Sequence, residues 1–518
     1  MKPTANTPIK SPNILWICTD QQRSDSLGCY GNTEVRSPNI DSLAASGVRF
    51  KRHITPMQIC SPSRATMITG LYPRNHQLIT NGRVLPESIP TITAALSSNG
   101  YHTHAVGKQH LQPILAPDEL NMPDSRAFWK RPENAQWNGP FYGYKTIDLL
   151  IGESDTAQIA GHYAKWLKTN YPQYVDHLKP RHADTPPPED LDEIWRSAMP
   201  VECHYNTWIT DRSVDFIASQ NNSESPFSLF VSFPDPHHPF DPPGEYADRY
   251  NPEDITLPTV TDSDLAGRPS YCDDLFPKGQ GFRKLYWQAD EGAEAGSTIT
   301  TDEVSDEAMR MAIAYTHAQV EMIDDGVGRM LASLEENGMM DNTIVIFTSD
   351  HGEYLGSHGL LHKGPASYRN LTELSMIVKG PGIKAGLEID SLTSHIDLTP
   401  TLLDLTDSGT IPNLDGISLK PLLDGSAASV RHYTFGEYHP TVRSDLYNQT
   451  LYQDQWRLTL YPHRSDLGEL FNLEEDPLEL NNLFSDPAMA SIKSELSHRL
   501  LTEFPPQAKV DNKLLCKW

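Results

Sequence analysis

The fold class follows from Ile14-Leu-Trp-Ile-Cys-Thr19, which is followed at once by Asp20 and Gln21. Its short run of apolar and β-branched residues ends abruptly in polar ones, which is typical of a strand buried on both faces of a sheet. Three later runs have the same character: His102 to Val106, Phe227 to Phe233 and Thr343 to Thr348. Because helical patterns lie between these runs, the sequence predicts the α/β class, with a large and mostly parallel sheet covered by helices on both faces.

Three short helices and one long helical stretch are expected between the strands. A proline at a first-turn position and a glycine just past the end bracket the first of them. The four segments are Pro38 to Gly47, Ser61 to Gly70, Thr91 to Gly100 and Asp306 to Gly338. The last segment carries apolar positions at helical spacing and is expected to form one long helix or two shorter ones.

Two segments, 112–226 and 241–300, scatter proline, glycine, aspartate and aromatic residues without periodicity, and are predicted to be insertions around the regular scaffold. Beyond about residue 410 short segments alternate like antiparallel strands, and a helix follows them. These segments are 433–438, 455–461 and 469–472, with the helix near 489–504. We therefore expect a large α/β domain over 1–410 and a smaller C-terminal α+β subdomain, with an antiparallel sheet, over 411–518.

Composition excludes some classes of protein. The 518 residues include 42 Lys plus Arg against 68 Asp plus Glu, a net charge of −26, which argues against a basic groove for nucleic acid. The longest apolar stretch near the N-terminus, residues 14–18, is too short for a signal peptide or a membrane span. The expectation is a protein without a membrane segment, either cytoplasmic or exported with its signal removed. Six scattered cysteines without a CxxC pair indicate neither a zinc site nor a disulfide framework.

Polar clusters follow each of the four predicted strands directly. These clusters are Asp20-Gln21, Lys108 with His110, Asp235 to His238, and Asp350-His351. Ligands of open α/β sheets bind at the carboxyl ends of the strands, so the four clusters are expected to converge on one site. Aspartate and glutamine oxygens suit calcium or magnesium, and a histidine adds an imidazole. Cations and histidines around such a metal favour an anion with tetrahedral oxygens, which indicates sulfate or phosphate ester chemistry. The cations and histidines in question are Arg64, Lys108, His110, His237 and Lys363.

One motif makes the inference specific. Cys60-Ser-Pro-Ser-Arg-Ala-Thr-Met-Ile-Thr-Gly-Leu-Tyr-Pro73 resembles the signature of type I sulfatases, the formylglycine-dependent enzymes of the alkaline-phosphatase-like superfamily. Further elements similar to that family follow the family's order: Pro12 to Asp20, Gly107-Lys-Gln-His110, His237-His-Pro-Phe240, Ser349 to Leu360 with Lys363, and Asp466 to Leu483. In its motifs the chain is closest to bacterial carbohydrate sulfatases, choline sulfatases and phosphonate monoester hydrolases. By this resemblance the domain over 1–410 is the catalytic one.

The resemblance also implies a role for each site residue. Cys60 would be oxidised to formylglycine, whose hydrate attacks sulfur with one hydroxyl and expels sulfate through the other. The implied metal ligands are Asp20, Gln21, Cys60, Asp350 and His351. The implied catalytic residues are Cys60, Arg64 orienting the hydrate, Lys108 and Lys363 neutralising sulfate oxygens, His110 assisting hydrate deprotonation or collapse, and His237 protonating the leaving alcohol. The implied substrate-binding residues are Asn81 and His238. Asn81-Gly82 is also consistent with a simple turn, and the roles of His237 and His238 could be reversed, with His238 as the acid.

The implied cofactors and partners follow. Calcium is favoured as the metal, with manganese or magnesium open because His351 stands where many arylsulfatases carry asparagine. A formylglycine-generating or anaerobic sulfatase-maturing enzyme would modify Cys60. Neither a nucleic acid nor a membrane is an expected partner, and the sequence predicts no oligomeric state.

The predicted activity is hydrolysis of a sulfuric ester on a carbohydrate, such as an algal polysaccharide or oligosaccharide of the carrageenan type. Aromatic residues of the two insertions are candidates for stacking on sugar rings: Trp129, Trp137, Tyr142, Tyr144, Trp195, Trp208 and Trp287. The alternatives are a phosphonate or phosphate monoester hydrolase, a choline sulfatase, and a non-catalytic protein that binds sulfated glycans. Lys108 and His110 favour a sulfatase, since related phosphonate hydrolases tend to carry neutral hydroxyl residues there.

Overall fold

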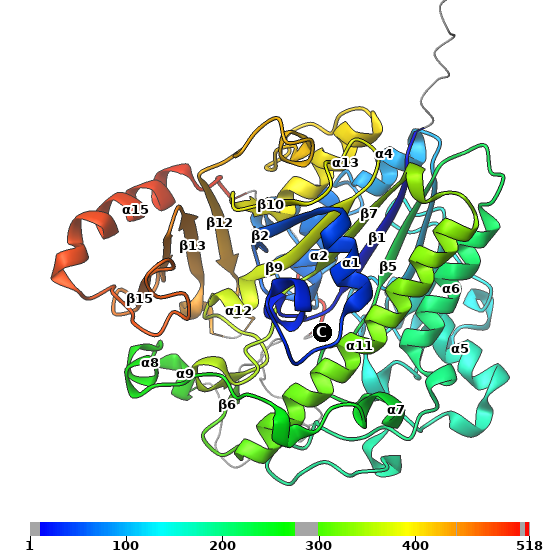
Figure 1. Cartoon of the computed structure of the whole chain (residues 1–518), viewed down its shortest axis with the longest axis horizontal. Helices are drawn as coiled ribbons and strands as arrows, with labels where there is room; N and C mark the ends of the chain where they lie inside the picture. Colours follow the sequence, from blue (N-terminus) through cyan, green and yellow to red (C-terminus); the bar gives the residue numbers. More distant parts are fainter. Residues whose placement is uncertain (1–10, 275–298, 442, 508–512, 517–518) are drawn as a thin grey trace, which may run out of the picture.

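The computed structural model describes residues 11–274, 299–441, 443–507 and 513–516. Within this part of the chain, nine strands form one sheet in the order β10-β2-β9-β7-β1-β5-β3-β4, with β11 paired to β2 (Figure 1). The strands are β1 (Asn13–Thr19), β2 (Val48–Ile54), β3 (His102–Lys108), β4 (Thr146–Leu150), β5 (Phe227–Ser232), β7 (Thr343–Ser349), β9 (Glu373–Lys379), β10 (Leu387–Ile389) and β11 (Thr393–Ser394). The pairings are parallel except those of β9, which runs against β2 and β7.

Strand β1 lies at the centre of this sheet and is buried on both faces. Ile14, Trp16 and Cys18 belong to one hydrophobic core cluster, whereas Leu15 and Ile17 belong to another. Successive side chains of a strand point to opposite faces, so this division means that a core lies on each side of the sheet. The apolar run that predicted a doubly covered strand therefore has its physical explanation in these two cores.

Helices cover both faces of the sheet, as the sequence predicts. Helices α1 (Pro38–Ser46), α5 (Gly161–Asn170), α6 (Tyr205–Ser219) and α11 (Asp306–Glu336) contribute to the core that holds Leu15. Helices α2 (Cys60–Thr69), α4 (Ile92–Ser98) and α13 (Leu398–Thr406) contribute to the core that holds Trp16. The long helical stretch is one helix, α11, which Figure 1 shows running beside α6.

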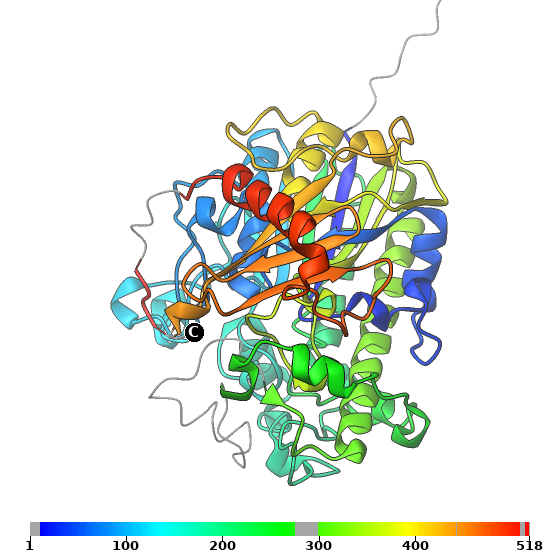
Figure 2. The same cartoon turned by 90° about the vertical axis from the view of Figure 1, so that its left-hand side faces the viewer.

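A separate antiparallel sheet forms in the C-terminal part of the chain. Its order is β12 (Tyr433–Tyr438), β13 (Asn448–Gln453), β14 (Trp456–Leu460) and β15 (Gly468–Asn472). Helix α15 (Ala490–Glu503) crosses this sheet in Figure 2 and packs on it through Leu496 and Leu500. The α+β character predicted for this part is confirmed, and a boundary near residue 410 stays a prediction.

The expectation for 112–226 is wrong in part, since this segment adds β4 to the edge of the main sheet and supplies α5 and α6. Strands β2 and β9 also have no counterpart in the predicted pattern. In β2 the charged residues Arg49, Lys51 and Arg52 interrupt the apolar run, so the strand is defined by its neighbours rather than by its own sequence.

Short elements complete the described chain: α3 (Pro73–His76), α7 (Gly244–Ala247), α8 (Asp262–Gly267), α9 (Tyr271–Asp274), β6 (Ile299–Thr300), β8 (Leu360–Leu361), α12 (Arg369–Thr372) and α14 (Lys420–Leu423). Strands β6 and β8 pair antiparallel. Within 241–300, residues 275–298 lie outside the described part. No helix among the described residues is both long and apolar enough to cross a membrane.

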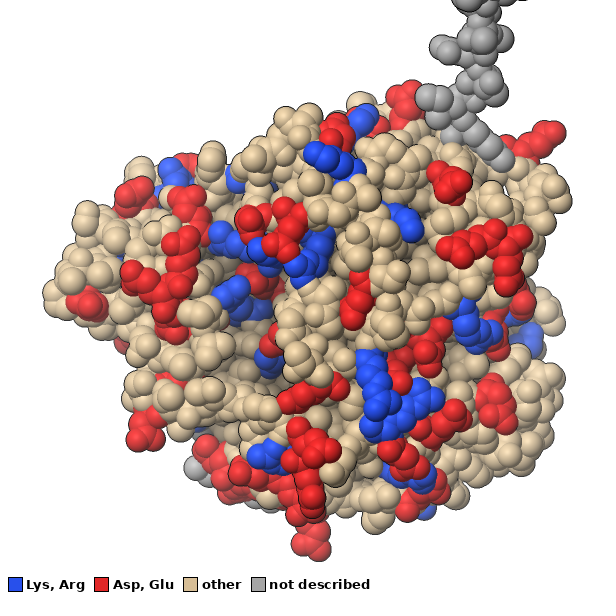
Figure 3. Space-filling model, in the orientation of Figure 1, with Lys and Arg blue, Asp and Glu red and all other residues tan. Residues whose placement is uncertain are grey.

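The acidic excess is spread over the surface. On the face in Figure 3, acidic side chains are scattered, and basic ones gather in small groups that adjoin acidic residues. Lys51, for example, lies 3.1 Å from Asp390 and also pairs with Glu388. The basic residues of this face therefore lie beside acidic ones and form no large basic patch.

Candidate active site

Four adjacent strands bring the predicted polar clusters together at one edge of the sheet. The order β7-β1-β5-β3 places Asp350 next to Asp20, and both near the loop that follows β5. Lys108 is the last residue of β3, and His237 lies in the loop after β5. These side chains are buried, between 0 and 3% exposed, so they form an interior site rather than a set of solvated turns.

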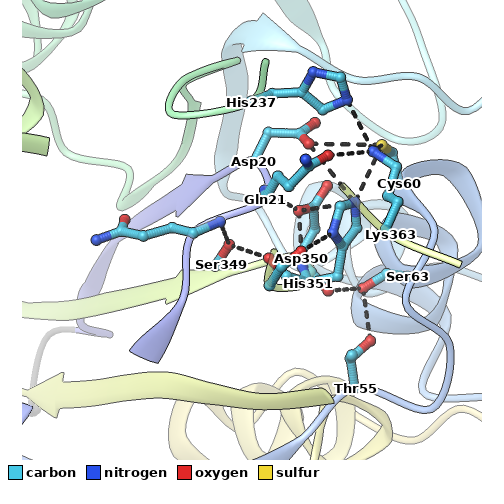
Figure 4. Close-up of polar contacts among 12 residues, drawn as sticks. Asp20, Gln21, Thr55, Cys60, Ser63, His237, Ser349, Asp350, His351 and Lys363 are labelled. Atoms are coloured by element: carbon cyan, nitrogen blue, oxygen red, sulfur yellow. Dashed lines mark hydrogen bonds and ion pairs between the residues drawn. The ribbon is translucent and has the colours of Figure 1, made fainter. Parts of the chain in front are cut away.

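A cluster of potential metal ligands lies at the centre of this site (Figure 4). Ligand atoms of Asp20, Cys60, Asp350 and His351 lie within 4.8 Å of one another. Nε2 of His351 is 3.3 Å from Cys60 Sγ and 3.7 Å from both Asp20 Oδ1 and Asp350 Oδ1. Nδ1 of His351 lies 2.9 Å from the carbonyl oxygen of Gly352, so Nδ1–H donates there and the Nε2 lone pair faces the carboxylates. Carboxylate oxygens with one imidazole fit a divalent cation.

Cys60 is the first residue of α2 and is 2% exposed. The backbone N–H of Ser61 donates to Asn81 Oδ1 at 3.1 Å, so Asn81 satisfies one of the unpaired amides at the start of this helix. Asn81, predicted to touch substrate, is thus placed with its carbonyl oxygen on the helix that carries Cys60. Burial, reinforced by the charge of Asp20, raises the pKa of the Cys60 thiol to about 12. An unmodified Cys60 is therefore a protonated thiol at neutral pH, and a weak nucleophile.

Arg64 binds the two buried carboxylates. Its Nε lies 2.9 Å from Asp350 Oδ2 and its Nη2 lies 3.0 Å from Asp20 Oδ2. Arg64 also donates to the carbonyl oxygen of Lys108 at 2.9 Å and to Ser232 Oγ at 2.7 Å. These contacts indicate that Arg64 holds the carboxylates in place, whereas the family resemblance assigns it to the nucleophile.

Lys108 has two carboxylate partners, Asp20 Oδ2 at 2.9 Å and Glu153 Oε2 at 3.0 Å. Burial raises the pKa of Asp20, but the charges of Lys108 and Arg64 outweigh it and hold that pKa well below its ordinary value. Burial and then the charge of Asp20 raise the pKa of Asp350 to about 7. A cation bound beside Asp350 would therefore stabilise the ionised form of this carboxylate.

Lys363 connects Cys60 with His237. Its Nζ lies 3.2 Å from Cys60 Sγ, 2.8 Å from His237 Nε2 and 2.5 Å from Gln21 Oε1. Nδ1 of His237 donates to the carbonyl oxygen of His238 at 2.5 Å, so Nε2 is the acceptor toward Lys363. Burial, then the charge of Lys363, keeps the pKa of His237 well below its usual value. Nε2 of His237 therefore accepts a hydrogen bond from Lys363 Nζ.

Gln21 and His110 lie next to the cluster in unusual backbone conformations. The backbone N–H of Gln21 donates to Asp350 Oδ1 at 3.0 Å, and its side-chain Nε2 lies 2.9 Å from His238 Nδ1 and also contacts Glu353. Both ring nitrogens of His110 lack hydrogen bonds among the described residues, and burial lowers its pKa well below the usual value. Gln21 and His110 have φ of +61° and +54°, a region that costs non-glycine residues energy and is found preferentially at functional sites.

Two acidic residues of the site, Glu153 and Glu353, are not predicted from the sequence. Glu153 comes from the segment 112–226, which shows no periodicity, so nothing marks it as a partner of Lys108. Glu353 belongs to the motif that begins at Ser349, but its contact with Gln21 depends on the fold.

The aromatic residues proposed for sugar stacking are placed elsewhere. Tyr144, Trp195 and Trp208 are buried, between 0 and 2% exposed. Trp129, Trp137 and Tyr142 pack against the core that holds Trp16. The prediction of sugar stacking is therefore wrong for the three buried rings, and for the three partly buried rings it stays a prediction. Trp287 lies outside the described residues.

The parallel sheet, the ligand cluster at its strand ends and the cysteine of a Cys-x-Pro-x-Arg motif define the class, metal-dependent ester hydrolases of the alkaline phosphatase superfamily. The family model described as Sulfatase matches residues 12–408, and the model described as N-sulphoglucosamine sulphohydrolase, C-terminal, matches residues 356–504. The chain belongs to the sulfatase family and is an enzyme of the sulfatase type. Enzymes of this family generally use a metal and formylglycine.

Three relatives are similar to the chain over most of its length. The uncharacterized sulfatase YidJ of Escherichia coli K12 is 28% identical over 504 residues, covering 95% of this chain and 87% of that protein. N-acetylglucosamine-6-O-sulfatase of Bacteroides thetaiotaomicron is 24% identical over 522 residues, covering 96% and 87%. The crystal structure of the phosphonate monoester hydrolase of Agrobacterium radiobacter is 25% identical, with a TM-score of 0.76 and 95% of each chain covered.

Proposed function

We propose that this enzyme removes sulfate from a sulfated carbohydrate, with Cys60 as the source of the nucleophile and residues 1–410 as the catalytic domain. The observation that carries the proposal is the position of Lys363 and Lys108 around Cys60. Lys363 Nζ lies 3.2 Å from Cys60 Sγ, and Lys108 Nζ lies 2.9 Å from Asp20, which itself contacts Cys60 at 3.6 Å. Two ammonium groups held beside the reacting residue suit the oxygens of a sulfate ester.

Formylglycine made from Cys60 by a maturing enzyme supplies, as its hydrate, one hydroxyl that attacks sulfur and a second that releases sulfate when the carbonyl re-forms. The chain's own residues prepare this position. His110 is buried with no hydrogen bond to its ring nitrogens among the described residues, and is proposed to take the proton of the hydrate. Asn81 holds the start of α2, so the residue at position 60 stays aimed at the carboxylates.

The residues proposed to hold the metal are Asp20, Gln21, Asp350 and His351, together with the group made from Cys60. The predominance of oxygen donors supports calcium, with manganese or magnesium as alternatives suited to the imidazole of His351. The chemistry that such a metal supplies is polarisation of a sulfate oxygen and stabilisation of the anionic nucleophile. Arg64 is proposed to orient the carboxylates of this set, which follows from its contacts with Asp20 and Asp350.

The leaving alcohol of a sugar sulfate needs a proton. Lys363 Nζ lies 2.8 Å from His237 Nε2, close enough to pass a proton to it. We assign His237 as the group that delivers this proton to the leaving oxygen, with Lys363 as its source and as a partner of the sulfate oxygens. His238 would bind substrate beside it, since the two rings stack with centroids 4.1 Å apart.

A carbohydrate is favoured as the substrate by the relative named N-acetylglucosamine-6-O-sulfatase, which aligns over 96% of this chain. An algal polysaccharide or oligosaccharide of the carrageenan type is the substrate proposed for first trial, although the buried rings Tyr144, Trp195 and Trp208 do not support it.

Phosphonate or phosphate monoester hydrolysis is the second candidate. The Asp20-Gln21 and Asp350-His351 pairs favour it, because they resemble the phosphonate hydrolases, and the Agrobacterium enzyme shares the fold with a TM-score of 0.76. Lys108 and His110 favour the sulfatase, since related phosphonate hydrolases tend to carry neutral hydroxyl residues at these positions.

The deciding experiment compares kcat/KM of the matured enzyme on nitrophenyl sulfate, on phenyl phosphonate and on defined sulfated oligosaccharides. We expect sulfate esters to be preferred, with at least one oligosaccharide exceeding the nitrophenyl ester. A preference for the phosphonate would overturn the sulfatase assignment. Cys60→Ala, carried through the same purification, measures the background of contaminating hydrolases.

A further inference from the structure

A second group of buried ligand-type side chains lies beside the site just described. It consists of Glu193, His238 and His362, which are between 0 and 3% exposed. One carboxylate oxygen and one nitrogen of each ring lie within 4.8 Å of one another. None of the three belongs to the Asp20, Cys60, Asp350 and His351 cluster, so the two groups are distinct.

The fold brings these residues from three distant segments. Glu193 precedes an isolated bridge between Ile194 and Phe240, in which the N–H of Phe240 donates to the carbonyl oxygen of Glu193 at 2.8 Å. This bridge fixes the segment 112–226 against the loop that carries His238. His362 follows β8 and is held by the N–H of Tyr354, which donates to its carbonyl oxygen at 2.9 Å.

The arrangement around His362 is specific. Its Nε2 contacts Glu193 Oε1, and its ring lies on the ring of His238 with centroids 3.8 Å apart. The backbone of His362 has φ of +64°, a left-handed conformation that is unfavourable for a non-glycine residue. This turn directs His362 toward Glu193 while the next residue, Lys363, reaches Cys60 at 3.2 Å.

Charge balance points to a cation. Glu193 is fully buried, and its second oxygen, Oε2, makes no hydrogen bond among the described residues. A buried carboxylate without a compensating cation or full hydrogen bonding is costly. A second buried carboxylate, Glu353, lies close by through its contact with Gln21, whose Nε2 is 2.9 Å from His238 Nδ1. A divalent cation among these groups would offset the negative charge.

We propose that Glu193, His238 and His362 form a second metal site, suited to a transition metal such as Zn²⁺. Two imidazoles and one carboxylate are a frequent ligand set for zinc, whereas the first cluster is richer in oxygen donors and suits calcium. Gln21 connects the two sites, since its N–H donates to Asp350 and its side chain meets His238. An ion at the second site would fix the position of His238 beside the substrate.

The test counts metal ions by mass spectrometry of the whole protein's metal content. Wild type, Glu193→Gln and Asp350→Asn are stripped with a chelator, equilibrated with Ca²⁺ and a small excess of Zn²⁺, and freed of unbound metal. We expect Glu193→Gln to lose the zinc of the second site, with at least ~100-fold weaker binding, because loss of a ligand exceeds the effect of an outer-shell change. Asp350→Asn should lose the ion of the first site and retain zinc.

The matched control is Glu189→Gln, which removes the same charge from an exposed residue four positions away and should bind zinc like wild type. Wild-type protein that holds a single ion per chain would overturn the proposal, whatever the variants do. Equal zinc content in wild type and Glu193→Gln would do the same, and would leave Glu193 and His362 as a hydrogen-bonded pair. Sulfate release plays no part in this count, so its outcome is independent of the proposed function.

Discussion

Two buried ion clusters of this molecule differ in what surrounds the charges. In the C-terminal sheet Arg457 Nη1 lies 2.8 Å from Glu469 Oε2 and its Nε lies 2.5 Å from Glu479 Oε1, all three residues being at most 1% exposed. The guanidinium also lies over the ring of Phe471, 4.7 Å from its centroid. These charges pair with one another within β14, β15 and the segment that follows, although Arg457 Nη2 and Glu469 Oε1 make no hydrogen bond among the described residues.

In the candidate active site Arg64 and Lys108 likewise pair with carboxylates, but here the second oxygen of each aspartate converges with other ligand atoms on one point. Asp20 Oδ1 and Asp350 Oδ1 face Nε2 of His351, and Cys60 Sγ lies among them. The cluster stands at the ends of strands, where different parts of the chain meet, rather than along them. Buried charge alone therefore does not identify a functional site; convergent ligand atoms around a potential nucleophile do.

The first prediction breaks the catalytic cluster at its centre. Cys60→Ala removes the precursor of the nucleophile, so sulfate ester turnover should fall by at least ~10⁴-fold, the size of loss seen when a nucleophile is deleted. Thermal unfolding should change little, since the thiol carries no ion pair. The measurement is kcat of matured protein beside a melting curve, and residual turnover near the wild-type level would contradict the assignment.

The second prediction separates proton donation from binding. His237→Ala should lower turnover of sugar sulfates by ~10²- to 10⁴-fold, because a sugar alkoxide is a poor leaving group. Nitrophenyl sulfate, whose leaving group needs less protonation, should lose much less. The two substrates are assayed on the same preparation, and equal losses on both would remove His237 from the role of acid.

The third prediction concerns the lysine that joins β3 to Asp20. Lys108→Ala should reduce kcat by ~10²- to 10³-fold, as removal of one group that stabilises developing charge usually does. KM should change less than kcat. Glu153→Gln serves as the milder companion, since Lys108 keeps its contact with Asp20 at 2.9 Å in that variant; a larger loss for Glu153→Gln than for Lys108→Ala would argue against this reading.

The fourth prediction concerns the buried ion cluster of the C-terminal sheet, where a substitution is expected to have the smallest effect on catalysis. Arg457→Met leaves two buried carboxylates without their cation and should destabilise the fold by about 3–5 kcal/mol. Activity per folded molecule should stay unchanged. Chemical denaturation and active-enzyme titration check the two parts, with Arg464→Met, an ion-paired surface residue, as a control expected to unfold like wild type. A selective loss of kcat in Arg457→Met would refute the contrast.

Much of this site is predictable from the sequence because strand ends and motifs are local features. Asp20 and Asp350 directly follow β1 and β7, and Cys60 lies in a continuous motif. Glu153 and Glu193 are not predictable in the same way, since they lie in a segment without periodicity and reach the site only through tertiary packing. The buried aromatic residues Tyr144, Trp195 and Trp208 fail for a related reason: such a ring has the same sequence signature whether it packs in a core or faces a sugar.

The fold shows the same division. β1 and α11 follow from strong apolar patterns, whereas β2 carries three charged residues and is recognisable as a strand only beside β9 and β10. Strands and helices are predictable where burial determines the pattern of apolar residues. They are not predictable where pairing with neighbouring elements determines the structure.

Cys60 is expected to act only after its conversion to formylglycine. The most direct measurement is mass spectrometry of the tryptic peptide from His53 to Arg64, taken from a fully active preparation made in a maturase-competent host. We expect turnover to rise in proportion to the fraction of this peptide that carries the aldehyde. A fully active preparation in which Cys60 remains an unmodified thiol would contradict it.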